Sequence, residues 1–147
     1  IAILPRTFVA REVFADTAFF VALLDPRDNL NEEAMALAER LARDGARMAT
    51  TDAILVETAN YCARGPLRAH AARWIEELRG DTDWNIIPLD RPTLLRAEVR
   101  YGRHVDKSWS LTDCHTMEAM RSRRARDIAT TDRGFSQAGF RCLLRLP

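Results

Sequence analysis

Residues 12–24, with the sequence EVFADTAFFVALL, decide the fold class. The first part, EVFAD, is a short apolar run that ends in a carboxylate, which is typical of a buried strand. TAFFVALL follows at once and has the length and composition of a compact apolar helix, ended by the turn-forming residues DPRDN. A buried strand that leads directly into a helix indicates the strand–helix units from which parallel sheets are built.

The rest of the chain repeats this alternation. Helices are predicted over residues 29–45, 52–64, 67–80, 91–104 and 111–124, and strands over 46–50, 83–89, 127–132 and 140–146. Asn29 or Asn31 is the expected N-cap of the first of these helices, and Gly45 is expected past its end. The pattern predicts an α/β fold of three layers, α/β/α, around a central, mostly parallel sheet of about five strands.

Length and composition fit one globular domain. With 147 residues, 47% of them hydrophobic, the chain is long enough to bury a core without disulfides or structural metals. Cys62, Cys114 and Cys142 are odd in number and show no C-x-x-C spacing, so we expect reduced thiols. We assign residues 12–147 to the domain and residues 1–11, which start with Ile rather than Met, to an N-terminal preamble.

Charge and apolar runs limit the partners. The net charge of +1 gives no overall basic field of the kind that marks a nucleic-acid binder, so only local patches can serve that role. The longest apolar runs fall far short of the roughly 20 residues that a membrane span requires. The opening residues lack a signal-peptide pattern. A cytoplasmic protein without membrane contact is expected.

Four carboxylates occupy positions that packing alone does not explain. Asp16 ends the first strand and Asp132 ends the predicted strand at 127–132, so both are expected at the edge of the sheet where parallel strands end. Asp113 shares a helix face with Met117 and Met120. Glu57 is predicted on a largely apolar face of the helix at 52–64.

Each of these acids also has a purely structural interpretation. Asp16 could cap a helix, and Ser110 with Asp113 fits a capping box. Asp132 could shape a turn. Glu57 could be solvated or could pair with a nearby arginine, Arg64 or Arg68.

If the four carboxylates lie close together, a cation is needed to offset their mutual repulsion. Two like charges at about 4 Å repel by on the order of 4 kcal/mol at an effective dielectric near 20. The only lysine, Lys107, offers no obvious partner, whereas carboxylate oxygens are the ligands that Mg²⁺ and Mn²⁺ prefer. One or two such ions favour chemistry at phosphate oxygens, and phosphodiester hydrolysis fits best.

Four segments resemble the PIN domain, the nuclease fold of VapC-type toxins. The resemblance covers roughly residues 12–147 and assigns the family's acids to Asp16, Glu57, Asp113 and Asp132. The segments are VFADTAFFVALLD, TTDAILVETANYCAR, DKSWSLTDCHTMEAM and IATTDRGFSQAGF.

The resemblance implies an endoribonuclease that depends on one or two Mg²⁺ or Mn²⁺ ions held by the four acids. It also implies a toxin of a type II toxin–antitoxin system that cleaves tRNA or rRNA, forms a homodimer and is silenced by a cognate VapB-type antitoxin. Thr17 and Thr130 fall where the family carries hydroxyls beside the acids. Some members carry a further acid shortly after the last one, where this chain has Gly134, Phe135 and Ser136, so a second metal is expected either to be weakly held or to arrive only with substrate.

Basic residues before the Asp113 helix are candidates for RNA phosphate contacts: Arg100, Arg103, His104 and Lys107. An ordinary solvated helix end is the alternative.

Two other functions also stay open. One is an acid-cluster phosphatase, although Asp16 is followed by Thr17 and Ala18 rather than by a D-x-D pattern. The other is a non-catalytic PIN-type module that binds RNA or protein.

Overall fold

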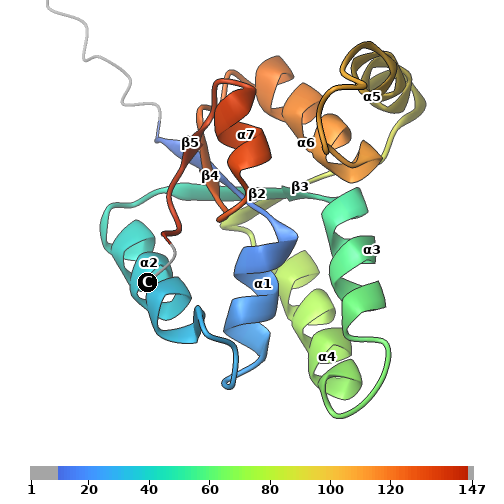
Figure 1. Ribbon diagram of the computed structural model, residues 1–147. Coiled ribbons are helices and arrows are strands. Elements are labelled where there is room, and N and C mark those ends of the chain that lie inside the picture. Colours follow the sequence, from blue (N-terminus) through green and yellow to red (C-terminus); the bar gives the residue numbers. More distant parts are fainter. Residues whose placement is uncertain (1–9, 146–147) are drawn as a thin grey trace, which may run out of the picture.

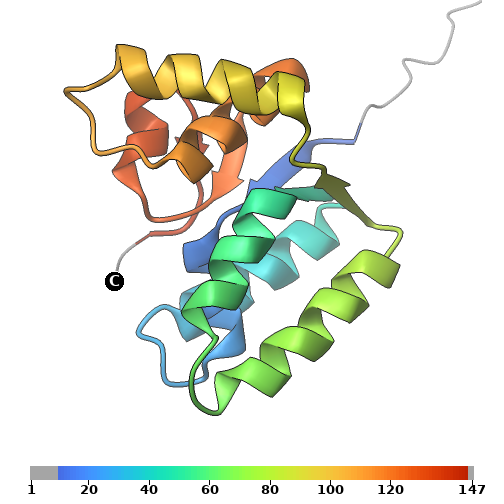
Figure 2. The same ribbon diagram turned by 90° about the vertical axis from the view of Figure 1, so that its right-hand side faces the viewer.

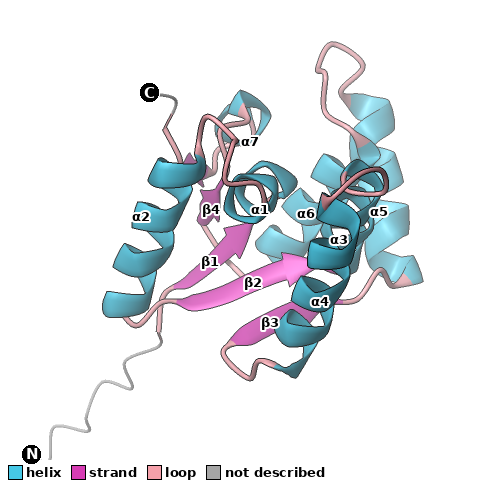
Figure 3. Ribbon diagram, turned by 90° about the horizontal axis from the view of Figure 1, so that it is seen from below, coloured by secondary structure: helices cyan, strands magenta, loops and turns pink. Residues whose placement is uncertain are grey.

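A sheet of five parallel strands organises the protein, and the computed structural model describes residues 10–145 of the chain (Figure 1). The strands are β1 Glu12–Ala15, β2 Arg47–Thr51, β3 Trp84–Ile87, β4 Asp127–Ala129 and β5 Arg141–Cys142. Their order in the sheet is β3-β2-β1-β4-β5, and every neighbouring pair is parallel. Figure 3 shows the shared strand direction from below. The predicted α/β fold with a central parallel sheet is confirmed.

Helices cover both faces of the sheet. They are α1 Thr17–Leu24, α2 Asn31–Arg43, α3 Asp52–Tyr61, α4 Leu67–Gly80, α5 Arg91–Arg103, α6 Leu111–Ser122 and α7 Arg133–Gln137. Helices α1 to α4 lie below the sheet and α5 to α7 above it (Figure 1). Because both faces are covered, strand residues on both sides of the sheet are buried, and in β1 the residues Val13, Phe14 and Ala15 are all apolar.

Strand β1 shows how this arrangement follows from the sequence. Successive side chains of a strand point to opposite faces. Val13 and Ala15 are fully buried in the core below the sheet, together with Phe19 and Phe20 of α1. Phe14 is fully buried in the second core, under α6 and α7. The central strand is therefore anchored in two hydrophobic cores at once.

Three local predictions need correction. Residues 133–137 form the short helix α7, which the sequence did not predict. Strands β4 and β5 are shorter than the predicted segments at 127–132 and 140–146. Neither Asn29 nor Asn31 caps α2: Leu30 holds the N-cap position, and the Asn31 side chain donates instead to the Ala22 carbonyl at 2.7 Å.

Two further predictions concern the ends and the membrane. Residues 1–9 of the proposed preamble lie outside the described residues, and residue 11 contributes an arginine that pairs with Asp127. Between residues 10 and 145, none of the helices combines the length and the apolar character that crossing a membrane requires. The three cysteines are free thiols, as expected.

Candidate functional site

The four predicted acids come from four elements around the carboxyl edge of the sheet, the edge beyond the C-terminal ends of the strands. Asp16 follows β1 directly and Asp132 lies at the N-cap of α7, just after β4. Asp113 is in the first turn of α6, and Glu57 lies in α3. Helices α3 and α6 contact each other, although they belong to distant parts of the sequence. The topology therefore brings these acids to one region.

Asp16 is the most deeply buried of the four, with 6% of its surface exposed. Its Oδ2 accepts a hydrogen bond of 2.8 Å from the Thr130 hydroxyl. Burial, with smaller contributions from the negative charges of Asp113 and Glu57, raises the pKa of Asp16 to about 7, although the hydrogen bonds from Thr130 and from the Thr17 backbone act in the opposite direction. Near neutral pH, Asp16 is therefore divided between its charged and neutral forms.

Thr130 connects Asp16 to Asp132. The Thr130 hydroxyl donates to Asp16 and accepts a hydrogen bond of 3.0 Å from the Asp132 backbone N–H. Asp132 in turn accepts a bond of 2.7 Å from the Gly134 N–H through its Oδ1, which caps α7. The predicted role of Asp132 in a local turn is thus realised as a helix cap, while its Oδ2 makes no hydrogen bond to the described residues.

Asp113 belongs to a capping box, as the sequence indicated. Its Oδ2 accepts from the Ser110 N–H at 2.8 Å, and the Ser110 hydroxyl accepts from the Asp113 N–H at 3.0 Å. Burial nevertheless raises the pKa of Asp113, and the charges of Asp132 and Glu57 act in the same direction. The capping role therefore does not remove the electrostatic strain on this carboxylate.

Glu57 is half-buried on α3, and its charge acts on both Asp16 and Asp113. Neither alternative pairing, with Arg64 or with Arg68, occurs among the ion pairs of residues 10–145, and the Arg68 guanidinium donates to the Ala63 carbonyl at 3.0 Å. The helix face around Glu57 is less enclosed than predicted, since Tyr61 is 65% exposed. Glu57 is thus close enough to act electrostatically on two of the other acids while remaining partly exposed.

The donor chemistry suits a hard divalent cation. Among residues 10–145, no ion pair joins any of the four acids to an arginine, lysine or histidine. The Thr17 hydroxyl, next to Asp16 in the sequence, is buried and has no hydrogen-bond partner in the described part of the chain. Within the same range, however, no three His, Cys, Asp or Glu side chains lie close enough to hold a metal ion together. The carboxylates share an electrostatic environment, but liganding by three of them requires them to move closer.

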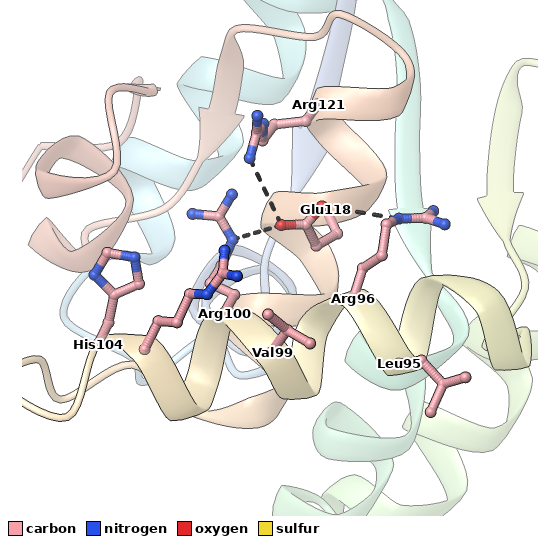
Figure 4. Close-up of a pocket in the computed structure, with 8 residues that line it drawn as sticks. Leu95, Arg96, Val99, Arg100, His104, Glu118 and Arg121 are labelled. Atoms are coloured by element: carbon pink, nitrogen blue, oxygen red, sulfur yellow. Dashed lines mark hydrogen bonds and ion pairs between the residues drawn. The ribbon is translucent and has the colours of Figure 1, made fainter.

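The basic residues predicted from the sequence have different surroundings (Figure 4). Arg100 donates through Nε to Glu118 Oε1 at 2.8 Å, and its side chain is only 11% exposed. Lys107 pairs with its neighbour Asp106 at 3.3 Å. Arg103 is exposed and forms no ion pair with the described residues. Only part of the predicted set is therefore free to meet a ligand.

The Arg100–Glu118 pair belongs to a cluster of charged residues, three of which the sequence did not predict: Arg96, Glu118 and Arg121. Glu118 lies among Arg96, Arg100 and Arg121. Two signals pointed to them: Arg96, Arg100 and Arg103 are spaced at i, i+4 and i+7 on one helix, and Glu118 precedes Arg121 by three residues on the next. What the sequence could not give is the packing of α5 against α6, shown in Figure 2.

Comparison with solved structures finds the same fold in several proteins, one of which is described as a toxin. VapC20 of Mycobacterium tuberculosis, a sarcin-ricin loop cleaving toxin, aligns with a TM-score of 0.76 at 24% identity, covering 87% of this chain and 95% of that one. FitAcB from Neisseria gonorrhoeae aligns with a TM-score of 0.63 at 17% identity, covering 89% and 96%. VapBC2 from Rickettsia felis, solved with a promoter DNA fragment, gives 0.66 at 10% identity, covering 90% and 97%.

Comparison of the sequence with protein families gives the assignment. No curated protein matches the chain. The family model of the PIN domain matches residues 13–141. This range includes all four acids and the whole sheet apart from Glu12, which begins β1, and Cys142, which ends β5. Since this match spans most of the sequence, the chain belongs to the PIN domain family.

Proposed function

We propose that this PIN domain is an endoribonuclease that depends on Mg²⁺ or Mn²⁺ and acts as the toxin of a type II toxin–antitoxin system. One observation carries the proposal: the buried carboxylate of Asp16 feels the charges of Asp113 and Glu57, and no cationic side chain among residues 10–145 pairs with it. A protein gains no stability from such an arrangement by itself. A divalent cation bound during function accounts for it.

Asp16, Glu57, Asp113 and Asp132 are the residues that would hold one or two ions. When bound, such ions activate water and stabilise the charge that develops on phosphate oxygens. The Thr130 hydroxyl fixes the orientation of Asp16, and the Ser110 N–H fixes that of Asp113. These hydrogen bonds are made to Oδ2 of Asp16 and to Oδ2 of Asp113.

The expected partners follow from the family and the relatives. RNA is the proposed substrate, with tRNA or rRNA as the target class, because the VapC20 toxin is a sarcin-ricin loop cleaving toxin. A VapB-type antitoxin is the proposed inhibitor, since the Rickettsia felis and Salmonella typhimurium relatives are VapBC proteins solved with DNA. A homodimer and a cytoplasmic location complete the proposal.

Cleavage of an RNA panel by purified protein with Mn²⁺ tests the activity. Asp113→Asn should lower the cleavage rate by on the order of 10³-fold, equal to about 4 kcal/mol of activation free energy. Asp90→Asn is the matched control: Asp90 also caps a helix, α5, through a hydrogen bond to the Thr93 N–H, and it is outside the acid cluster. Its cleavage rate should stay near that of the unaltered protein.

Other outcomes would redirect the assignment. Equal cleavage by the unaltered protein and the Asp113→Asn variant would show that the activity does not come from these acids. Hydrolysis of small phosphomonoesters without RNA cleavage would identify a phosphatase. RNA retention without cleavage at any Mn²⁺ concentration would identify a binding module.

A further inference from the structure

A groove between α5 and α6 is lined by several arginines (Figure 4). We call it the arginine groove. Its volume is about 430 Å³, and its charged wall consists of Arg96, Arg100, Arg103, Arg121 and Glu118. Four guanidinium groups therefore surround one carboxylate, which leaves a net charge of about +3 in the groove.

Glu118 organises the arginines. Its carboxylate lies 2.8 Å from Nε of Arg100, 3.9 Å from Nε of Arg96 and 3.8 Å from Nη1 of Arg121. Arg100 is 11% exposed and is held in place by this bond, whereas the side chains of Arg96 and Arg121 are 50% and 66% exposed. The exposed guanidiniums thus keep most of their N–H donors free, in positions that are partly fixed before any ligand arrives.

The donor set selects the class of ligand. Guanidinium groups present a planar fork of N–H donors that matches phosphate oxygens, and they bind them in pairs of parallel hydrogen bonds. The positions of Arg96, Arg100 and Arg103 along α5 repeat such donors every turn, with Arg121 facing them from α6. A ligand with several phosphates in a row matches this repetition better than a single anion does.

The groove adjoins the acids through a short chain of contacts. His104, at its end, packs against the ring of Trp109 with 4.8 Å between ring centroids. Trp109 in turn contacts Gly134 so closely that a Cβ added there would come within 2.8 Å of the indole ring. The Gly134 N–H is bound to Asp132. These contacts, which pass through the buried Trp109, connect the His104 end of the groove to the segment that holds Asp132.

We propose that the arginine groove binds the backbone phosphates of single-stranded RNA and guides the strand to the acids. This inference rests on the proposed function, because it takes the substrate of that reaction as its ligand. A second copy of the chain fits the groove less well, although Leu95 and Val99 give it an apolar margin. A symmetric contact would place each groove against the same positive groove of the partner.

RNA binding without cleavage tests the proposal. In an Asp113→Asn background without divalent metal, Arg103→Gln and Arg121→Gln are combined, because both side chains are exposed and their loss leaves the Arg100–Glu118 pair intact. Fluorescence anisotropy of a fluorescein-labelled single-stranded RNA of mixed sequence gives Kd between about 50 and about 200 mM salt. We expect Kd to rise about tenfold at low salt and the salt slope to fall by about 1.4, since each phosphate contact contributes about 0.7.

Arg43→Gln combined with Arg73→Gln is the matched control, with the same change of charge on exposed positions of α2 and α4 below the sheet. Its Kd and salt slope should equal those of the Asp113→Asn parent. An unchanged slope in the groove variant, an equal loss in the control, or no binding by the parent at low salt would each overturn the proposal. Failure of the nuclease itself appears separately, as absence of RNA cleavage by the unaltered protein with Mn²⁺.

Discussion

Two buried carboxylates lie at opposite edges of the sheet: Asp127 at the start of β4 and Asp16 just after the end of β1. The pKa of Asp127 is lowered, whereas that of Asp16 is raised. At the start of β4, Asp127 accepts hydrogen bonds of 2.6 and 2.9 Å from Arg141 and another from Arg11. Burial alone would raise the pKa of Asp127, but the bonds from these arginines outweigh it and lower the pKa. At the other end of β1, burial raises the pKa of Asp16, and no arginine among residues 10–145 is bonded to that carboxylate.

The difference separates two uses of a buried acid. An acid whose charge is matched by arginine within the chain, like Asp127, strengthens the folded state. An acid buried among other acids, like Asp16, weakens the folded state until something else supplies positive charge. Both lie on the same sheet and have similar exposure, 3% and 6%, so burial by itself does not distinguish them. The identity of the neighbours does.

Removing the charge of Asp16 should give the largest effect on stability. The pKa of Asp16 is raised to about 7 in the folded protein, above its usual value of 3.8, so the folded state binds more protons between these values. The free energy of unfolding therefore falls as pH rises from about 4 to 7. Without metal, Asp16→Asn should stabilise the protein by on the order of 3 kcal/mol at pH 8 and by little at pH 4. Urea unfolding at both pH values measures this, and an equal effect at the two would contradict it.

Binding of a divalent metal should offset the destabilisation that the buried charge of Asp16 causes. At a concentration of Mn²⁺ about 100 times its Kd, the unaltered protein should gain about 2.7 kcal/mol, seen as a rise in Tm. Asp16 must lose its proton to bind the ion, so the gain should shrink as pH falls below about 7. Asp16→Asn should abolish most of the gain, whereas Asp127→Asn should retain it. A Tm that Mn²⁺ raises equally in both variants would place the metal elsewhere.

Asp127→Asn should move stability in the opposite direction to Asp16→Asn. The change leaves Arg11 and Arg141 without their partner, but these arginines are 43% and 66% exposed, so solvent reduces the loss to about 2 kcal/mol. The pKa of Asp127 is lowered, so its contribution is present above pH about 4 and is lost as pH falls through its folded value. Urea unfolding should therefore show a deficit at pH 7 that narrows in acid. If Asp127→Asn instead stabilised the protein, the proposed difference between Asp127 and Asp16 would be wrong.

The sequence predicted regular elements well where local preference and packing agree. Helices α1 and α4 begin and end at the predicted residues, because TAFFVALL is apolar after its first residue and Gly80 ends an amphipathic repeat. Helix α7 was missed because Asp132, Arg133 and Gly134 read as a turn. It is held by the Asp132 cap and by the full burial of Phe135, and that burial is a tertiary effect.

The placement of two of the candidate acids at one edge of the sheet was predictable for a similar reason. Parallel strands end at one edge, so Asp16 and Asp132 could be placed there from the order of elements alone. Hydrogen bonds between distant residues could not be foreseen, such as the bond from Thr130 that links these two acids. The pairing of Arg100 with Glu118 was equally hidden, because it depends on how α5 lies across α6.

The smallest predicted effect concerns the N-terminus of α6, where structural and functional roles meet in one residue. Ser110→Ala removes the hydroxyl that accepts from the Asp113 N–H and should lower stability by about 1 kcal/mol. The Ser110 N–H still holds the Asp113 carboxylate, so the rise in Tm with Mn²⁺ should persist. Asp113→Asn keeps an oxygen that can accept from this N–H and loses only the charge, and it should therefore lose the Mn²⁺ effect while keeping the cap. If Asp113 were only a capping residue, the two variants would respond to Mn²⁺ alike.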